Sequence, residues 1–389
     1  MGKKVLIVGG VAGGASVAAR VRRLDESAEI VMFERGPYVS FSNCCIPFHI
    51  SGDIEKSESL VLMTPPEFDK QYNIDARVYN EVVAINKEEK TVSVKNVQTG
   101  ETYEEAYDVL FLAPGANAVR PRSIAGIDSK HVFVMKTVPD VAALTAYTKA
   151  NEVKDVAVVG GGYIGLEVAE NLKMAGYNVS LIEAQDQIMA PLDYDMVQII
   201  NREIMKNGVD LILKDSVQAI GSDEVTLASG RTVKAQAVVM AIGVSPENAL
   251  AKQAGLELGV AGSIKVNHHY QTSNPHIYAV GDAIETTCFF TGQKTQLTLA
   301  GPAQRQARAA ADHVYGRTYL NTGVIGSSSV KMFGLNSANT GLNEKQCQAR
   351  GIAYDFAYII PKDKVSIMPG AENLFFKLIF AVPSGKILG

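Results

Sequence analysis

The chain has 389 residues, a length at which a single core usually gives way to two or three domains. Hydrophobic residues make up 47% and charged residues 20%, which is ordinary globular composition and excludes a disordered or fibrous chain. The 37 Lys and Arg residues against 41 Asp and Glu residues give a net charge of −4, so nucleic-acid or anionic-membrane binding is not the default expectation.

The start of the chain shows no targeting segment. Met1–Lys4 leads directly into Val5–Val8, a short apolar run typical of a buried strand. A signal peptide needs a longer apolar stretch, and a membrane span needs about 18 apolar residues. The cysteines are too few for a disulfide-stapled secreted scaffold; they are Cys44, Cys45, Cys288 and Cys347. We therefore expect a cytoplasmic, reducing location.

The first candidate nucleotide-binding unit covers Lys3–Glu34. It reads as a strand, a glycine-rich turn, a helix and a second strand that ends in an acidic residue. In the turn, Val11 stands where a strict G-x-G-x-x-G pattern has its second glycine. A tight turn without a ligand is the alternative interpretation. The residues predicted to bind a dinucleotide here are Gly9, Gly10, Gly13, Gly14 and Glu34.

A second unit of the same kind covers Asp155–Glu183, and its turn fits G-x-G-x-x-G. The glycines allow a tight turn, a close approach of a pyrophosphate and close packing of helix on strand, while the helix N-terminus supplies N–H donors. The Glu183 carboxylate would bind a ribose 2′-hydroxyl and repel a 2′-phosphate, and Ala184–Asp186 offers no cation. This pattern favours NADH over NADPH. The predicted NADH-binding residues are Gly160, Gly162, Ile164, Gly165 and Glu183.

The segments after the two units have shorter elements. Residues 77–112 and 209–243 alternate short β-runs with turn residues, which predicts antiparallel strands. From Val330 onward the pattern is mixed, with one helix over Asn343–Arg350, so we expect a third domain. Leu374–Phe380 reads as a strand followed by a turn, and the chain stops midway through this hairpin. A strand without a partner is a poor terminus, so we expect the native protein to continue.

A further pattern resembles a known class of flavoproteins. Thr272–Asp282 is a polar turn, a strand and then Gly-Asp, which resembles the second flavin fingerprint of flavoproteins with two dinucleotide-binding domains. Ala113–Gly115 and Ala241–Gly243 resemble the strand exits of the same superfamily. The resemblance implies that Asp282 binds the ribityl chain of FAD; a structural aspartate is the alternative. It also implies FAD contacts at Ala113, Gly115, Gly281 and Asp282, and an NADH contact at Gly243.

These patterns together predict an α/β fold with two Rossmann-like dinucleotide-binding domains. We expect a discontinuous FAD-binding domain over 1–112 and 245–324, and an NAD(P)H-binding domain over 113–244. Residues 325–389 would form a C-terminal α+β interface domain that is incomplete.

The cysteine pair follows the first unit directly, within Pro37–Pro47. The position five after Cys44 is His49, so the C-x-x-x-x-C disulfide of flavin disulfide reductases of the glutathione-reductase type cannot form. A helix beginning at Pro47 would lower the pKa of the Cys44 thiol, and the thiolate is the nucleophile. Such a single thiolate beside a flavin can cycle through a mixed disulfide, a persulfide or a sulfenate.

With Ser40-Phe41-x-Asn43-Cys44 and the glycine turn upstream, residues 3–386 resemble coenzyme A–disulfide reductases and the related CoA-dependent persulfide and sulfur reductases. Further matches are Leu299–Ala303, a helix start over the flavin, and Ala338–Leu342. The resemblance implies a homodimeric enzyme with Cys44 as redox-active residue, Asn43 as its polar neighbour, and Leu299 and Ala300 at FAD. It also implies that CoA is bound by Ser16, Arg20, Arg23, Ser40 and Asn43.

The spacing of Ser16, Arg20 and Arg23 puts them on one stripe of the first helix, where two guanidinium groups suit a CoA phosphate. A solvated basic face is the alternative. Ala12 replaces the histidine of related NADH oxidases and peroxidases, which argues against imidazole-assisted peroxide or oxygen reduction. The histidines show no metal-ligand spacing, and we predict no metal site.

Two departures from the family pattern leave alternatives open. Cys45 stands where relatives carry Gly or Ala; it could be a buried filler, a resolving thiol or half of a disulfide with Cys44. Ile367-Met368 replaces a tyrosine pair that serves the partner subunit's active site in relatives. Cys288 and Cys347 are interpreted as structural. The alternative functions are an NADH-dependent reductase of a protein carrier or organic acceptor without cysteine chemistry, and a flavin-bound redox sensor.

Overall fold

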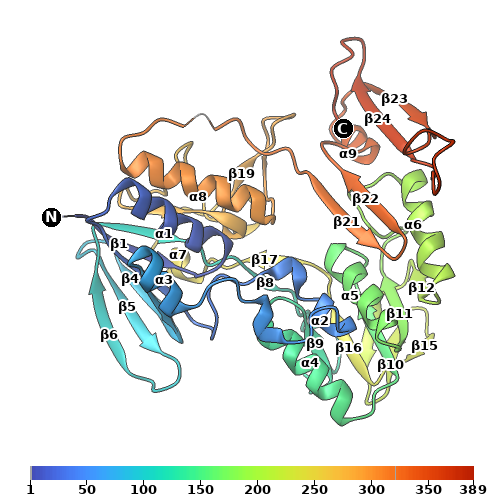
Figure 1. The fold of residues 1–389 in the computed structure, drawn as a ribbon, viewed down its shortest axis with the longest axis horizontal. Coiled ribbons are helices and arrows are strands. Elements are labelled where there is room, and N and C mark those ends of the chain that lie inside the picture. The colour runs from blue at the N-terminus through green and yellow to red at the C-terminus, as the bar shows by residue number, and fades with distance from the viewer. Residues whose placement is uncertain (1, 320) are drawn as a thin grey trace.

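Two five-stranded parallel sheets dominate the computed structural model, which describes residues 2–319 and 321–389 (Figure 1). The first sheet has the order β18-β7-β1-β2-β3, and all neighbouring strands are parallel. Its strands are β1 (Lys4–Val8), β2 (Glu29–Glu34), β3 (Asp75–Val78), β7 (Val109–Leu112) and β18 (Ile277–Ala279). Val109–Leu112 is buried throughout, as expected for a strand covered on both faces.

The second sheet has the order β12-β11-β10-β16-β9 and is also parallel. Its strands are β9 (Val132–Val134), β10 (Asp155–Val159), β11 (Asn178–Glu183), β12 (Asp210–Leu213) and β16 (Ala237–Met240). With helices packed on both parallel sheets, the predicted α/β fold with two Rossmann-like units is confirmed.

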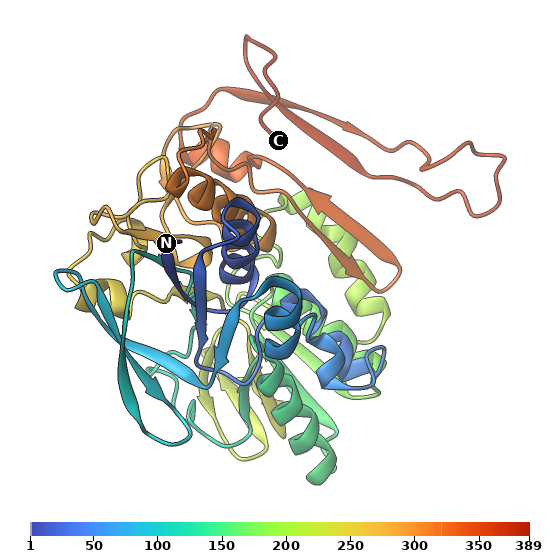
Figure 2. The same cartoon turned by 60° about the vertical axis from the view of Figure 1, so that its left-hand side comes forward.

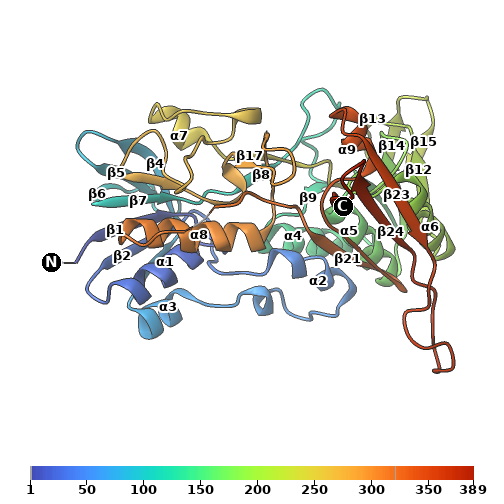
Figure 3. The same ribbon diagram turned by 90° about the horizontal axis from the view of Figure 1, so that it is seen from above.

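Each sheet carries its own helices and a small antiparallel sheet. α1 (Ala12–Leu24) and α8 (Ala300–Val314) lie side by side on the first sheet (Figure 3). α4 (Val138–Ala150), α5 (Tyr163–Met174) and α6 (Tyr194–Lys206) belong to the second. The antiparallel additions are β4 (Asn80–Asn86), β5 (Thr91–Asn96) and β6 (Thr102–Ala106) beside the first sheet, and β13 (Val217–Ile220), β14 (Glu224–Leu227) and β15 (Thr232–Lys234) beside the second.

The two chain crossings between the sheets pair with each other. β8 (Ala116–Ala118) leaves the first sheet and β17 (Val244–Pro246) returns to it, and the two form an antiparallel ribbon. α7 (Ala249–Gln253), β19 (Thr286–Thr287) and β20 (Lys294–Thr295) follow the return. The helices in the described ranges include none that is long and apolar enough to cross a membrane.

Four short elements connect β2 with the rest of the first sheet. They are the 3₁₀ turns η1 (Asn43–Cys45) and η2 (Ser57–Leu60) and the helices α2 (Phe48–Ser51) and α3 (Pro65–Tyr72). α2 packs against α5, a helix of the second sheet that is far from α2 in sequence. The segment that carries Cys44 is therefore held between the two units.

The C-terminal region consists of two hairpins and a helix, and its outer hairpin extends beyond the body of the molecule (Figure 2). β21 (Ser328–Met332) and β22 (Leu335–Asn339) pack near α5, and α9 (Glu344–Ala349) confirms the helix predicted over Asn343–Arg350. β23 (Tyr354–Ile359) and β24 (Phe376–Ala381) form the outer hairpin.

Two strand predictions were wrong in detail. Residues 77–112 and 209–243 were expected to form antiparallel strands, yet β7, β12 and β16 join the parallel sheets. β7 and β16 are buried at every residue, whereas β12 is an edge strand in which only Ile212 is buried. The strand predicted over Leu374–Phe380 was expected to lack a partner. Instead β24 pairs with β23, and the Leu388 N–H returns to bond the Ile379 carbonyl at 2.8 Å.

Candidate active site

A cavity of about 1270 Å³ joins the two glycine turns and reaches Cys44. It brings together most of the predicted site residues: Gly9, Gly13, Glu34, Asn43, Cys44, Ala113, Gly115, Gly160, Gly162, Ile164, Glu183, Gly243, Gly281, Asp282, Leu299 and Ala300. The remaining predicted residues, Gly10, Gly14, Ser16, Arg20, Arg23, Ser40 and Gly165, are not part of its lining.

The first glycine turn is built so that side chains are excluded from it. Gly9 has a φ of +96°, and a Cβ atom there would lie 2.1 Å from the Ala113 carbonyl oxygen. A Cβ atom on Gly14 would lie 1.8 Å from the Gly9 carbonyl oxygen. The Glu34 carboxylate accepts hydrogen bonds from the Gly10 N–H at 3.0 Å and the Gly36 N–H at 2.8 Å. Glu34 thus fixes the turn as well as bordering the cavity.

The second turn repeats this construction. A Cβ atom on Gly160 would lie 2.4 Å from the Ala241 carbonyl oxygen, and one on Gly165 would lie 1.9 Å from the Gly160 carbonyl oxygen. The Glu183 carboxylate accepts from the Gly161 N–H at 2.7 Å and from the Gln185 N–H at 2.8 Å.

Both helices that follow these turns have free N-termini. α1 and α5 begin without a side-chain cap and without an acidic residue in the first turn. Their first N–H groups therefore have no partner within the helix and carry the positive end of the helix dipole. Each glycine turn lets a ligand come close to the backbone, and the uncapped N–H groups of the following helix border the cavity. Both features fit the pyrophosphate of a dinucleotide at each turn.

Asp282 lies on the 3₁₀ turn η4 (Gly281–Ala283), with a cation beside it that the sequence patterns did not indicate. The Lys136 ammonium is 3.6 Å from the Asp282 carboxylate, and burial raises the pKa of Asp282. The Lys136 carbonyl accepts a hydrogen bond from the Asn43 side chain at 3.0 Å. Lys136 precedes α4 outside every motif, so only the tertiary contact identifies it as part of the site.

Cys44 is exposed at η1 and borders the cavity. Cys45 is half-buried and packs against the apolar core of the second sheet. All four cysteines are free in the described structure, so the two neighbours form no disulfide with each other. These surroundings fit the filler interpretation of Cys45.

The expectation of a lowered thiol pKa at Cys44 was wrong. Desolvation raises the pKa of Cys44, and the Glu167 carboxylate and Cys45 raise it further. The helix after Cys44 is also only four residues long, with Pro47 before its start. A dipole from one turn of helix does not offset the nearby carboxylate.

Glu167 is a second site residue that the sequence patterns missed. It borders the cavity from α5, and burial together with the nearby Glu170 raises its pKa to about 7. Glu170 is buried and accepts a hydrogen bond from the Phe333 N–H at 2.7 Å. The available signal was two acids, three residues apart, within an otherwise apolar helical run.

The predicted CoA-binding stripe on α1 is divided by its contacts. Arg20 pairs with Asp312 of α8 at 2.5 and 2.9 Å, whereas Arg23 is exposed. Arg22, which was not predicted as a site residue, donates to backbone carbonyls that include those of Tyr72 and Asn73. Of the two predicted arginines, Arg23 has the freer guanidinium group.

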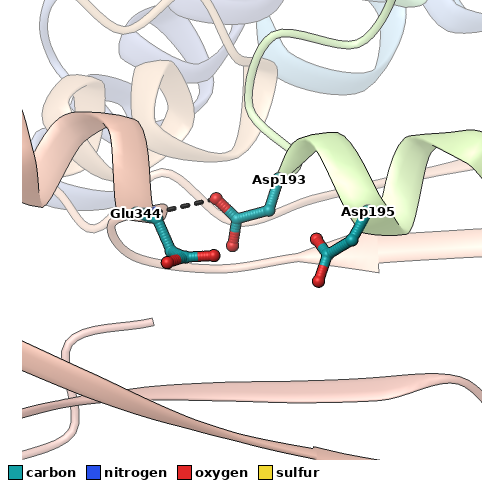
Figure 4. A group of neighbouring side chains, drawn as sticks. All are labelled: Asp193, Asp195 and Glu344. Atoms are coloured by element: carbon teal, nitrogen blue, oxygen red, sulfur yellow. Dashed lines mark hydrogen bonds between the residues drawn. The ribbon is translucent and has the colours of Figure 1, made fainter.

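Three carboxylates meet where α6 contacts α9, and Figure 4 shows Asp193, Asp195 and Glu344 turned toward one another. The Lys377 ammonium of β24 lies among them, 3.3 Å from Asp193 and 2.9 Å from Asp195, and it also pairs with Glu344. Because the Lys377 side chain, only 4% exposed, ends among these carboxylates and offsets part of their charge, we interpret the group as an attachment of the outer hairpin rather than as a metal site.

Comparison with known proteins gives consistent matches over nearly the whole chain. The pyridine nucleotide-disulphide oxidoreductase family profile matches residues 3–307. Coenzyme A disulfide reductase of Staphylococcus epidermidis is 33% identical over 386 residues, which covers 99% of this chain and 87% of the relative. The crystal structure of reduced Bacillus anthracis CoADR-RHD superposes with a TM-score of 0.98 at 46% identity, covering 100% of this chain and 70% of that one. An NAD-dependent persulfide reductase from A. fulgidus superposes with a TM-score of 0.95 at 30% identity, covering 99% and 72%.

Proposed function

The chain belongs to the pyridine nucleotide-disulphide oxidoreductase family, and we propose that it uses NADH and FAD to reduce a disulfide or persulfide of coenzyme A at Cys44. It is thus an oxidoreductase of a family that works with FAD and NAD(H). One observation carries the proposal. The exposed Cys44 thiol borders the same cavity into which both glycine turns open.

In this proposal the chain's part is to hold the two cofactors and a reactive sulfur together. The Gly9–Gly14 turn with Glu34 and Asp282 would hold FAD, and the Gly160–Gly165 turn would hold NADH. Lys136 would keep the Asn43–Cys45 turn and Asp282 in place through its carbonyl and its ammonium group. Bound FAD would supply the two-electron chemistry between NADH and sulfur.

Cys44 would act as the nucleophile. Its thiolate attacks one sulfur of a CoA disulfide, which forms a mixed disulfide and releases one CoA thiolate. Reduction of that mixed disulfide by two electrons restores the Cys44 thiolate and releases a second CoA thiolate. A CoA persulfide would place its outer sulfur on Cys44 in the same way, and two electrons and protons would release it as hydrogen sulfide.

Substrate recognition is assigned to α1 and the cysteine turn. Ser16 and Arg23 lie outside the buried stripe of α1. The guanidinium group of Arg23 is exposed and is free to contact a CoA phosphate. Arg20 would have to share its guanidinium group with Asp312. Asn43 directly precedes Cys44, Ser40 lies four residues before it, and these two residues complete the set.

NADH is proposed as the reductant in preference to NADPH. The Glu183 carboxylate borders the cavity where a nucleotide ribose would lie and is bonded to two backbone N–H groups, so it stays in place as an acceptor for a 2′-hydroxyl. A 2′-phosphate there would meet like charge.

We further propose a domain division and a dimer. The strands of the first sheet fall within 1–112 and 245–324, and those of the second within 113–244, which supports FAD- and NAD(P)H-binding domains with these bounds. The outer hairpin exposes apolar side chains such as Phe356, Ile359 and Phe376, which suit an interface with a second copy. Ile367 is 87% exposed, so the residue in the family's tyrosine position also lies on that surface. The four free cysteines support a reducing, cytoplasmic location.

The decisive experiment is NADH oxidation by the flavin-loaded enzyme with CoA disulfide and with CoA persulfide. We expect Cys44→Ser to lower turnover about 1000-fold, and its neighbour Cys45→Ser, the matched control, to change it less than about threefold. Intact mass before and after dithiothreitol would report a CoA-sized adduct on Cys44.

Two outcomes would contradict the proposal. Turnover that survives Cys44→Ser would favour reduction of a protein carrier or an organic acceptor. Negligible NADH consumption by the wild-type enzyme with every disulfide and persulfide would favour a redox sensor.

A further inference from the structure

Side chains from four separate segments meet at one edge of the cavity, and we call them the clasp. Arg35 directly follows Glu34 at the end of β2, and Glu81 belongs to β4. Asn117 lies on β8 and Glu247 follows β17, so both belong to the ribbon that connects the two sheets (Figure 1). The clasp consists of Arg35, Glu81, Asn117 and Glu247. All four border the cavity, so contacts among them join walls that come from different segments.

The Arg35 guanidinium group is the centre of these contacts. It lies 3.5 Å from the Glu247 carboxylate and 3.8 Å from the Glu81 carboxylate, and it donates to the Asn117 side-chain oxygen at 3.3 Å. The Asn117 side-chain nitrogen donates in turn to the Glu247 carboxylate at 2.8 Å. Two carboxylates therefore share one cation, and an amide bridges that cation and one of the carboxylates.

The clasp has a fixed side and a side that faces solvent. The Glu247 side chain is 17% exposed, its carboxylate accepts from the Ala249 N–H at 3.2 Å, and its own N–H donates to the Gly115 carbonyl at 3.0 Å. The Arg35 side chain is 53% exposed, so salt screens its ion pairs and each pair contributes little alone. The Arg35 contacts are therefore the part of the clasp that can open.

This edge of the cavity is where the adenosine end of a dinucleotide is expected. In a strand–turn–helix unit of this kind, the carboxylate at the end of the second strand meets the adenosine ribose, and here that carboxylate is Glu34. Arg35 is the next residue, borders the same cavity and is half exposed. The clasp thus lies beside the adenosine end, at the solvent edge of the cavity.

We propose that the clasp closes the cavity over the adenosine end of FAD, and that its Arg35 contacts must break before FAD enters or leaves. The strength of these contacts then contributes to the rate of flavin exchange. This inference rests on the proposed placement of FAD at the Gly9–Gly14 turn. Its test follows flavin release and needs no turnover.

The test is the rate at which the flavin-loaded enzyme releases FAD after dilution, followed by flavin fluorescence at about 50 mM and about 500 mM NaCl. Arg35→Gln removes the cation, so we expect release at low salt to be about three- to fivefold faster. Release from the wild type should accelerate with salt, because screening weakens the same ion pairs, and this salt effect should be smaller in the variant. Glu257→Gln, which breaks the exposed Glu257–Lys265 pair away from the cavity lining, is the matched control and should match the wild type.

A second variant separates the clasp from simple attraction between charges. Glu247→Gln makes the cavity wall less negative, which by charge alone would hold the anionic FAD more tightly. In the clasp it removes a partner of Arg35, so we expect release to be about two- to threefold faster. The double variant should release FAD no faster than Arg35→Gln alone, because both changes break the same contact.

Three outcomes would overturn the proposal: a wild-type release rate in Arg35→Gln, slower release from Glu247→Gln, or effects that multiply in the double variant. Circular dichroism and thermal unfolding verify the fold of each variant. An enzyme that holds FAD and gives one of these outcomes contradicts the clasp and leaves the proposed function intact. Purified wild-type protein that binds no FAD would overturn both.

Discussion

The two strand–turn–helix units share one backbone design but differ in the helix that follows the turn. In both, the first and last glycines of the turn approach carbonyl oxygens so closely that no side chain fits, and a glutamate at the end of the second strand holds the turn. Beyond the first turn, α1 carries three arginines, whereas α5 carries Glu167 and Glu170. The comparison teaches that the backbone selects the kind of ligand, while the rest of the helix decides what chemistry lies next to it.

The largest effect should come from closing either turn. A Cβ atom on Gly14 or on Gly165 would collide with the carbonyl oxygen of the first glycine, so Gly14→Val and Gly165→Val should each destabilise their own unit by about 3 kcal/mol or more. We expect Gly14→Val to yield protein without flavin, and Gly165→Val to retain flavin that NADH no longer reduces. Flavin absorbance and stopped-flow reduction measure the two losses.

Gly162→Ala serves as the stability control for both, because a Cβ atom there meets no protein atom within 4 Å, but it does not control for NADH binding, since Gly162 borders the cavity. Its thermal unfolding should match the wild type. A comparable loss of flavin in both valine variants would show that the two units do not bind separate cofactors.

The next effect concerns the two glutamates that hold the turns. Glu183→Gln combined with Ala184→Arg exchanges a repelling charge for an attracting one, so the ratio of kcat/KM for NADPH to that for NADH should rise about 10- to 100-fold. Steady-state kinetics with both nucleotides measure this ratio. The corresponding change in the first unit, Glu34→Gln, should leave the ratio unaltered, and a shift of similar size there would reject the assignment of the two turns.

The smallest effect is expected on the basic helix. Arg23→Gln should raise KM for CoA disulfide about five- to tenfold with little change in stability, and the difference should shrink as salt increases. Arg22→Gln is the matched control, since Arg22 binds backbone carbonyls and its loss should lower Tm and leave KM unchanged. If both variants have wild-type KM values, α1 presents only a solvated basic face.

The sequence predicts much of this fold because its strongest patterns are local. Each glycine turn, the carboxylates that end β2 and β11, and the start of α8 at Ala300 are set by neighbouring residues, and the α/β fold with FAD and NAD(H) was confirmed. The parallel pairing of β12 was missed, since a short apolar run does not specify its partner.

The electrostatics of the site could not be predicted in the same way. Glu167 contributes to the raised thiol pKa of Cys44, and the Asp282 carboxylate is paired with the Lys136 ammonium. In both cases the two partners lie on segments that are remote from each other in sequence. Lys377 likewise pairs with carboxylates at α6 and α9 that no spacing rule connects with it. Charge compensation is a property of tertiary contacts, so it appears only when the chain is folded.

The paired crossings β8 and β17 have a consequence for how the two units can move. Both connections run through one short ribbon, in which Asn117 also donates to Glu247 at 2.8 Å. At a separate place in Figure 1, β21 meets α5, where the Phe333 N–H is bonded to Glu170. Because α2 of the cysteine segment also packs against α5, the second unit is held at three separate places. An opening of the nucleotide cavity about the ribbon would therefore have to break contacts at α2 or at β21.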